Sequence, residues 1–155
     1  MKIKILLILS MLVFLKGGMS MAQTNKEMIR VYDAETKTYK DVPKVEKTPA
    51  EWKKELSAAE YHVTCEHGTD LPFAGELNKN KRKGHYKCTA CGLDLFDSDH
   101  KFDSGTGWPS FYQPIDKVNV ATTVDESHGM ERVEVHCPRC GAHLGTVFDY
   151  GHKPT

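Results

Sequence analysis

The fold of this sequence is decided by two copies of one short pattern, Cys88-Thr89-Ala90-Cys91-Gly92 and Cys137-Pro138-Arg139-Cys140-Gly141. Each C-x-x-C turn points two sulfur atoms at one place, and the glycine that follows lets the chain turn tightly. Together the turns supply four soft ligands, the set that structural zinc prefers in a tetrahedral site. Because four protein ligands leave no open position on the metal, we expect a structural Zn²⁺ held by Cys88, Cys91, Cys137 and Cys140.

Two other uses of these cysteines remain open. Either pair could be a redox dithiol, although that use favours a strand–helix–strand context that this region lacks. In an oxidising compartment the four cysteines could instead form two disulfides. Two matched C-x-x-C-G turns favour zinc over both alternatives.

The chain around these turns has the pattern of a small antiparallel β domain. After Tyr61, short apolar stretches alternate with clusters of turn-forming residues, at 68–70, 78–80, 103–105 and 125–127. Val133 and Val135 alternate with Glu134 and His136, as in a half-buried strand. Since no helical period is sustained, we predict a mainly β fold.

A helix start precedes the β region, in the string Thr48-Pro49-Ala50-Glu51. The threonine can cap the helix, the proline suits its first position, and the glutamate can reach back to the backbone N–H of the cap. Trp52, Leu56 and Ala59 then fall on one face of a short helix. One or two short helices should therefore open the domain, which we place at residues 48–155.

The first residues indicate export. Lys2 and Lys4 precede an apolar run over residues 5–15, and Ser20-Met21-Ala22 puts small residues where a signal peptidase cuts. We predict a signal peptide over residues 1–22, with an uncut membrane anchor as the alternative, and hence a periplasmic or secreted protein. The polar residues 23–47 predict an extended, loosely held arm.

Charge excludes some partners. The 155 residues include 21 Lys and Arg and 21 Asp and Glu, for a formal net charge of +0. Nucleic-acid and acidic-membrane partners usually show as a basic excess. We therefore expect no nucleic-acid partner, and no membrane partner after the signal peptide is cut.

Three further strings are interleaved with the cysteine turns. They are Gly68-Thr69-Asp70-Leu71-Pro72-Phe73-Ala74-Gly75 upstream, Lys101-Phe102-Asp103-Ser104-Gly105-Thr106-Gly107-Trp108-Pro109-Ser110-Phe111 between the pairs, and His143-Leu144-Gly145 with Val147-Phe148 after them. In this order the chain resembles the zinc-binding B-type methionine-R-sulfoxide reductases, from about Thr48 to Thr155.

The resemblance implies a small antiparallel two-sheet domain, like a β-tent or barrel, with a structural zinc. It implies a peptide-methionine (R)-S-oxide reductase that repairs oxidised methionine in proteins or peptides. In the implied mechanism a cysteine thiolate attacks the sulfoxide sulfur, methionine leaves, and the resulting sulfenic acid condenses with a resolving cysteine. A thioredoxin-like reductant then reopens the disulfide.

The chemistry of the substrate suggests candidate site residues. Methionine sulfoxide has a methyl group, which suits an aromatic wall, beside a strong S=O acceptor, which needs donors. Trp108 is a candidate wall with Phe111 behind it, although a tryptophan there could instead staple two strands of the core. His143 is a candidate catalytic donor or water-positioning group, with a histidine satisfied near the zinc site as the alternative. Thr146 is a candidate substrate donor.

The sequence departs from the family pattern in several places. The nucleophile of the family lies just past a proline-threonine pair, and this chain ends at Pro154-Thr155, so that cysteine and a closing strand are absent. We expect a truncated chain rather than a natural short form. Thr146 replaces the second histidine of the family's His-Leu-Gly-His string. Tyr150 stands for its acid, His152 for its proline, and Thr106 for a common resolving cysteine.

Cys65 is the cysteine outside the two pairs, so it is a candidate resolving thiol, with a buried, inert thiol as the alternative. Two other functions stay open. A zinc-stabilised relative without activity could serve as a binding module, and a periplasmic protein could use the C-x-x-C pairs for dithiol–disulfide exchange.

Overall fold

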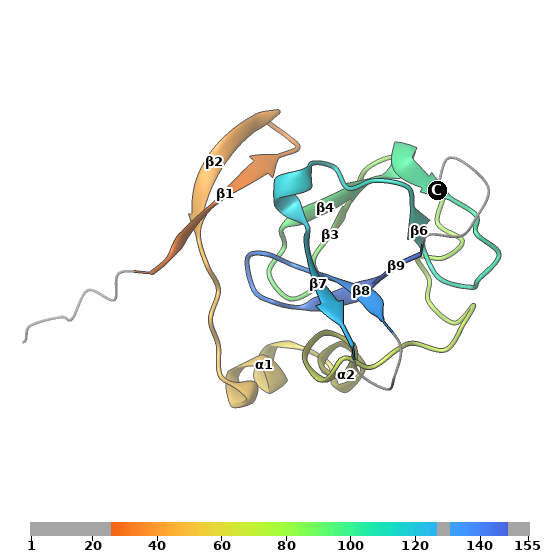
Figure 1. Ribbon diagram of the computed structural model, residues 1–155, viewed down its shortest axis with the longest axis horizontal. Coiled ribbons are helices and arrows are strands. Elements are labelled where there is room, and N and C mark those ends of the chain that lie inside the picture. The colour runs from red at the N-terminus through yellow and green to blue at the C-terminus, as the bar shows by residue number, and fades with distance from the viewer. Residues whose placement is uncertain (1–25, 127–130, 149–155) are drawn as a thin grey trace, which may run out of the picture.

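The computed structural model describes residues 26–126 and 131–148. The predicted signal peptide, Tyr150, His152 and the end of the chain lie outside the described residues. Strands dominate the described part, and two short helices lie together along one edge of it (Figure 1).

The helices and strands of the described residues have the following bounds. The strands are β1 (Met28–Asp33), β2 (Thr38–Pro43), β3 (His85–Lys87), β4 (Asp94–Asp97), β5 (Lys101–Phe102), β6 (Ser110–Phe111), β7 (Ala121–Asp125), β8 (Arg132–His136) and β9 (His143–Val147). The helices are α1 (Pro49–Glu55) and α2 (Ala58–Glu66), with 3-10 turns η1 (Ser98–His100) and η2 (Lys117–Asn119).

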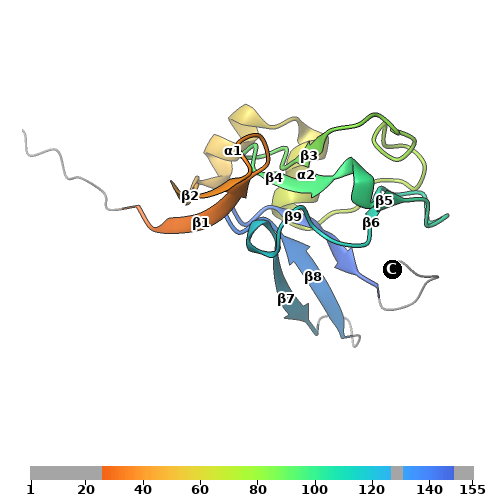
Figure 2. The ribbon, with the colours of Figure 1, turned by 90° about the horizontal axis from the view of Figure 1, so that it is seen from above.

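The strands form four small antiparallel sheets, which are β1–β2, β3–β4, β5–β6 and the three-stranded β7–β8–β9. The prediction of a mainly β, antiparallel domain is confirmed, but the prediction of two sheets is wrong for the described residues. The strands β5 and β6 are two residues each, and the β3–β4 ladder shifts register between Tyr86 and Lys87, so these ladders are too short to merge. In Figure 2 the strands β7, β8 and β9 extend away from the other sheets.

The predicted helix start is confirmed, but one expected helix face is wrong. Thr48 and Glu51 form a reciprocal capping box at the start of α1. The chain leaves the helical conformation at Leu56, because Ser57 and Glu60 form a second capping box that starts α2. Ala59 therefore lies on a different helix from Trp52, whose side chain is the buried one of α1.

The N-terminal segment is not the loose arm that its polarity predicts. Within residues 23–47, β1 and β2 pair over six residues each, and the side chain of Val31 is buried in the domain core. The exposed positions of the hairpin are mostly polar, although Met28 and Tyr39 are exposed too, and Ile29 and Val42 pack against the core. A strand that buries only one face needs few apolar residues, so the composition of residues 23–47 does not indicate a strand.

Asn119, in η2, fastens this hairpin to the domain. Its side chain is 0% exposed, and it accepts a hydrogen bond from Tyr32 N (2.7 Å) while donating to Tyr32 O (2.8 Å) and Asp94 O (2.7 Å). One amide therefore satisfies three backbone groups, on β1 and on β4.

The core is small and centred on two cysteines. Its buried members are Val31, Cys88, Leu93, Leu95, Cys137 and Ala142. They come from the first hairpin, from both C-x-x-C turns and from the strand that follows the first turn. Within the described residues, no helix is both long and apolar enough to cross a membrane.

Replacing Asn119 by alanine should lower the free energy of unfolding by about 2 to 4 kcal/mol, because it leaves buried backbone groups without partners. Urea unfolding of the two proteins measures this difference. The matched control is Asn80→Ala, which removes one exposed hydrogen bond from Arg82 N and should change stability by less than about 0.5 kcal/mol. Equal effects of the two substitutions would contradict the fastening role of Asn119.

Candidate functional site

The four paired cysteines form one cluster, with their sulfur atoms all within 4.8 Å of one another. The Sγ atoms of Cys88 and Cys140 are 3.7 Å apart, and those of Cys91 and Cys137 are 3.5 Å apart. In a tetrahedral site with metal–sulfur bonds of about 2.3 Å, neighbouring sulfur atoms are about 3.8 Å apart. The cluster can therefore accept a tetrahedral metal ion with little movement.

The two turns that carry the sulfur atoms are built in the same way. Gly92 N donates to Cys88 O at 2.7 Å, and Gly141 N donates to Cys137 O at 2.8 Å. Both glycines have φ of +74°, a conformation that strains residues with side chains. This repeated geometry explains why a glycine follows each C-x-x-C.

The sulfur cluster is partly shielded from solvent, and its thiols interact strongly. Cys88 is 2% exposed and Cys137 is 0% exposed, while Cys91 and Cys140 are half-buried. Hydrogen bonds with Cys137 and Cys140 lower the pKa of the Cys91 thiol, whereas hydrogen bonds with Cys137 and Cys88 raise the pKa of the Cys140 thiol. Four thiolates this close repel one another, and a bound cation would remove that repulsion.

The contacts of 3.5 and 3.7 Å cross from one C-x-x-C turn to the other, so the four thiols behave as one group. None of the five cysteines is joined in a disulfide. This arrangement favours a metal centre over two independent redox dithiols.

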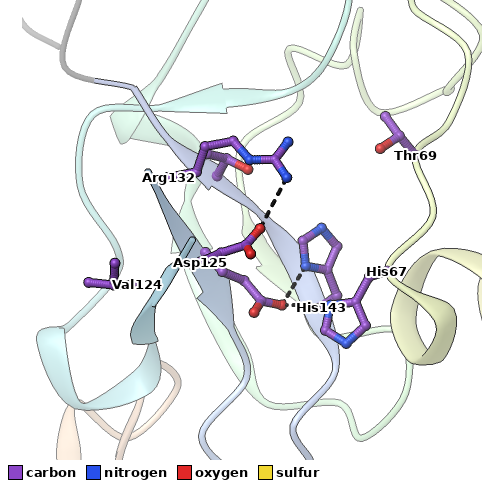
Figure 3. Close-up of a pocket in the computed structure, with 8 residues that line it drawn as sticks. His67, Thr69, Val124, Asp125, Arg132 and His143 are labelled. Carbon is purple, nitrogen blue, oxygen red and sulfur yellow. Dashed lines mark hydrogen bonds and ion pairs between the residues drawn. The ribbon is translucent and has the colours of Figure 1, made fainter. Parts of the chain in front are cut away.

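A pocket of about 390 Å³ lies between the three-stranded sheet and the loop that follows α2 (Figure 3). Its lining residues are His67, Thr69, Val124, Asp125, Arg132, Glu134, His143 and Thr146. Two of the sequence-predicted site residues, His143 and Thr146, are therefore brought together here. Arg132 and Asp125 pair across β8 and β7 at 3.1 Å.

Glu134 is the centre of the polar side of the pocket. Its Oε1 atom accepts a hydrogen bond from His143 Nδ1 at 2.7 Å and lies 3.0 Å from His67 Nδ1. Partial burial acts to raise the pKa of Glu134, but the hydrogen bond from His143 and the charge of His67 outweigh it and leave the pKa below its ordinary value. The carboxylate therefore stays ionised and holds both rings toward itself.

A register shift between β8 and β9 makes this contact possible. Val135 pairs with Gly145, but His136 pairs with His143, so Leu144 is an extra residue on β9. With regular pairing, His143 would point to the face opposite Glu134, because side chains alternate along a strand. The extra residue turns His143 to the face of Glu134 and Thr146.

Trp108 lies beside the pocket rather than in its lining. Its ring Nε1 donates to the carbonyl of Asp70 at 3.0 Å, one residue from Thr69 of the lining, and the residue is 37% exposed. Gly107 holds it there: its carbonyl accepts from Phe73 N at 2.8 Å, its φ is +97°, and an added Cβ would lie 2.9 Å from that same nitrogen.

Phe111, which was predicted to stand behind Trp108, is not among the residues that line the pocket. Its ring stacks on Phe96 with centroids 4.4 Å apart and meets Tyr86 edge-on at 4.8 Å. It therefore belongs to an aromatic cluster of β3, β4 and β6. A phenylalanine three residues after a tryptophan gives no signal that separates these two roles.

Cys65 lies on α2, two residues before His67, and is half-buried. Its sulfur is 3.5 Å from Thr64 Oγ1. It is outside both the sulfur cluster and the lining of the pocket, although it is close to that lining along the chain.

Glu134 and His67, which contact His143 in the pocket, are not among the site residues predicted from the sequence. Glu134 alternates with Val133 and Val135, which marks it as a strand residue of the polar face but assigns it no function. His67 ends α2 in the left-handed conformation (φ 55°, ψ 31°), and no pattern in the sequence predicts its contact with β8. The Gly68-Thr69 string beside His67 is the sequence feature that could have pointed to this part of the pocket.

The fold and the site thus define a small β domain with a four-cysteine centre and a histidine–glutamate pocket. A family model described as the SelR domain matches residues 56–155. The chain is 55% identical over 111 residues to the peptide methionine sulfoxide reductase MsrB of Methanosarcina barkeri, which is 72% of this chain and 78% of that protein.

Other relatives carry the same name. The MsrB of Leptospira interrogans is 51% identical over 111 residues, and that of Pseudomonas aeruginosa is 49% identical over 112 residues. Each alignment covers 72% of this chain and 85% of the relative. The chain therefore belongs to the SelR-domain family of peptide methionine sulfoxide reductases.

The substitution Glu134→Gln should lower the free energy of unfolding by about 1 kcal/mol at pH 7, because a charged acceptor of two histidines is lost. The folded-state pKa of Glu134 is below its unfolded value, so its contribution is present above the unfolded pKa and lost as pH falls through the folded pKa. Urea unfolding of both proteins from pH 7 to pH 3 measures the difference.

The control is Glu46→Gln at an exposed position, which should leave stability unchanged over this range. A difference between wild type and Glu134→Gln that stays constant down to pH 3 would contradict the ionic role of Glu134.

Proposed function

We propose that this protein reduces methionine-R-sulfoxide in proteins and peptides to methionine, with thiols as the electron donors. Membership of the peptide methionine sulfoxide reductase family carries the proposal. The pocket supports it, because it presents a histidine held by a carboxylate next to a threonine hydroxyl, both of which can meet an S=O oxygen.

The pocket suggests how the substrate would bind. In its doubly protonated form His143 donates from Nδ1 to Glu134, and its Nε2–H is then the donor left to face the sulfoxide oxygen. Thr146 pairs with Glu134 across the β8–β9 ladder, so its hydroxyl is available on the same face as a second donor. The half-exposed ring of Trp108 would contact the methyl group from the rim of the pocket.

The reaction needs two thiols and two protons. A cysteine thiolate forms a bond to the sulfoxide sulfur, and the sulfoxide oxygen is protonated. This oxygen then moves to the cysteine sulfur as its bond to the substrate sulfur and the new S–S bond break, which releases methionine and leaves a sulfenic acid. A second thiol then attacks the sulfenic sulfur, which forms a disulfide and releases water. His143, oriented by Glu134, would hold and deliver a proton at the sulfoxide oxygen, where negative charge develops.

The four clustered cysteines would hold a structural Zn²⁺. The donor set fits this ion, because four sulfur atoms at nearly tetrahedral spacing are its commonest structural environment. The bound zinc would crosslink the two turns and take no electrons. It would also protect the four thiols from the oxidation that the reaction imposes on other cysteines.

The first test of the function is stereospecific turnover by the full product of the gene that encodes this sequence. Peptides with methionine-R-sulfoxide should be reduced in the presence of dithiothreitol, and the S isomers should not. His143→Ala should lower kcat/KM about 100-fold or more, because the proton donor is lost. His62→Ala, an exposed histidine on α2, should leave it unchanged. Reduction of the S isomer, or full activity of His143→Ala, would contradict the proposal.

Metal analysis tests the zinc centre. The purified protein should contain one tightly held zinc per chain, and Cys137→Ser should lose it together with several kcal/mol of stability, since structural zinc contributes directly to folding. Cys65→Ser is the matched control and should keep the metal. A protein that is folded without metal and contains two disulfides would overturn this assignment.

Cys65 is the proposed resolving thiol, because it lies in the stretch that leads into the pocket. Cys65→Ser should keep one stoichiometric reduction of the sulfoxide but lose thioredoxin-dependent multiple turnover by at least about tenfold. Single-turnover and steady-state assays on the full gene product separate these steps. Unchanged steady-state turnover with thioredoxin would mean that Cys65 is an inert thiol.

A further inference from the structure

We propose that His67, Glu134 and His143 form a second metal site, separate from the four cysteines, for a divalent transition-metal ion such as Co²⁺, Ni²⁺ or Zn²⁺. Such an ion would occupy the sulfoxide pocket and compete with the substrate. The metal-binding part stands on the geometry alone, and the competition rests on the proposed function.

The three side chains converge from separate elements. His67 ends α2, Glu134 is on β8 and His143 is on β9, and one ligand atom from each lies within 4.8 Å of the others. Both histidines turn Nδ1 toward the same carboxylate oxygen, at 2.7 and 3.0 Å, and their ring centroids are 5.2 Å apart. Figure 3 shows the rings of His67 and His143 close together in the pocket.

These distances suit coordination as well as hydrogen bonding. Metal–nitrogen and metal–oxygen bonds of about 2.1 Å place neighbouring ligand atoms about 3 Å apart around an octahedral ion. An ion at the centre of the cluster would take the place of the hydrogen bond between His143 and Glu134 and of the ion pair between His67 and Glu134. Two imidazoles and one carboxylate are a ligand set that divalent iron, cobalt, nickel and zinc accept, with positions left open to solvent.

The surroundings favour a cation. The side chains of Glu134 and His143 are 19% and 15% exposed, while that of His67 is 62% exposed. Two of the three ligands are therefore largely buried, and the third, His67, is open to solvent. Arg132 is the nearby opposing charge, and it is paired with Asp125. Among the described residues that line the pocket, two carboxylates and one guanidinium give a net charge of one negative unit when the histidines are neutral, which favours a cation.

Occupation of this site would block the proposed reaction. The ion would bind Nδ1 of His143, whereas the sulfoxide oxygen is assigned to Nε2 of the same ring, so the competition would come from shared space. The open positions of the ion, with the water that they hold, would fill the part of the pocket that Thr69 and Thr146 line. Excess transition metal would then raise the KM for the sulfoxide without changing kcat.

Titration of zinc-saturated protein with Co²⁺ tests the site. One further ion per chain should bind, with weak d–d absorption and without a thiolate charge-transfer band, and it should broaden the NMR signals of both histidine rings. His67→Ala is the main variant because this side chain is exposed, and it should weaken Co²⁺ binding by about tenfold or more while keeping the cysteine-bound zinc. Glu134→Gln should do the same.

The matched control is His62→Ala, because His62 and Glu66 also form a histidine–glutamate pair, at 3.1 Å, on the surface of the same helix. Its Co²⁺ affinity should be that of the wild type. No second ion, a thiolate band, or equal affinity in His67→Ala and wild type would overturn the site. Co²⁺ bound at the three residues in a protein without reductase activity would leave the metal site standing and refute the proposed function instead.

Discussion

The convergence of four cysteine sulfur atoms is the constraint on which the rest of this structure depends. The core has few buried side chains, and two of them are Cys88 and Cys137. A domain with so small an apolar core gains little from burial alone, so a metal crosslink at its centre would have a large effect on stability. The N-terminal hairpin joins the same centre through Val31, which is buried in the core. The segment that follows β2 joins it through Arg139, whose carbonyl accepts a hydrogen bond from Val45 N at 2.7 Å. Nη1 of Arg139 in turn donates to Cys91 O at 3.0 Å.

The sulfur cluster also determines the geometry of the pocket. The second C-x-x-C turn is the connection between β8 and β9, and Glu134 and His143 each lie three residues from it. A metal ion bound by both cysteines of this turn would fix the register of the two strands. That register contains the extra residue, Leu144, that brings His143 to the face of Glu134. The β8–β9 hairpin thus links the sulfur cluster to the pocket that contains Glu134 and His143.

Local patterns predicted the parts of the fold whose causes are local. The capping box at Thr48, the strand around Val133 and the two cysteine turns each follow from a few neighbouring residues. The sequence alone did not reveal the hairpin β1–β2, because its buried face depends on contacts with residues distant in the chain. It did not reveal the role of Asn119 either, because that role depends on hydrogen bonds with β1 and β4, which are also distant in the chain. The contact of His67 with β8 depends on where α2 ends in space. The chemistry of the substrate pointed to His143 and Thr146, which line the pocket, but the sequence does not show how the ring of Phe111 packs against Phe96 and Tyr86.

Zinc K-edge X-ray absorption of the purified protein tests the central claim most directly, because it reports the atoms around the metal. We predict a single shell of four sulfur neighbours at about 2.3 Å. A shell that contains nitrogen or oxygen at the tightly bound zinc, or fewer than four sulfur neighbours, would contradict the account of how this fold is held together.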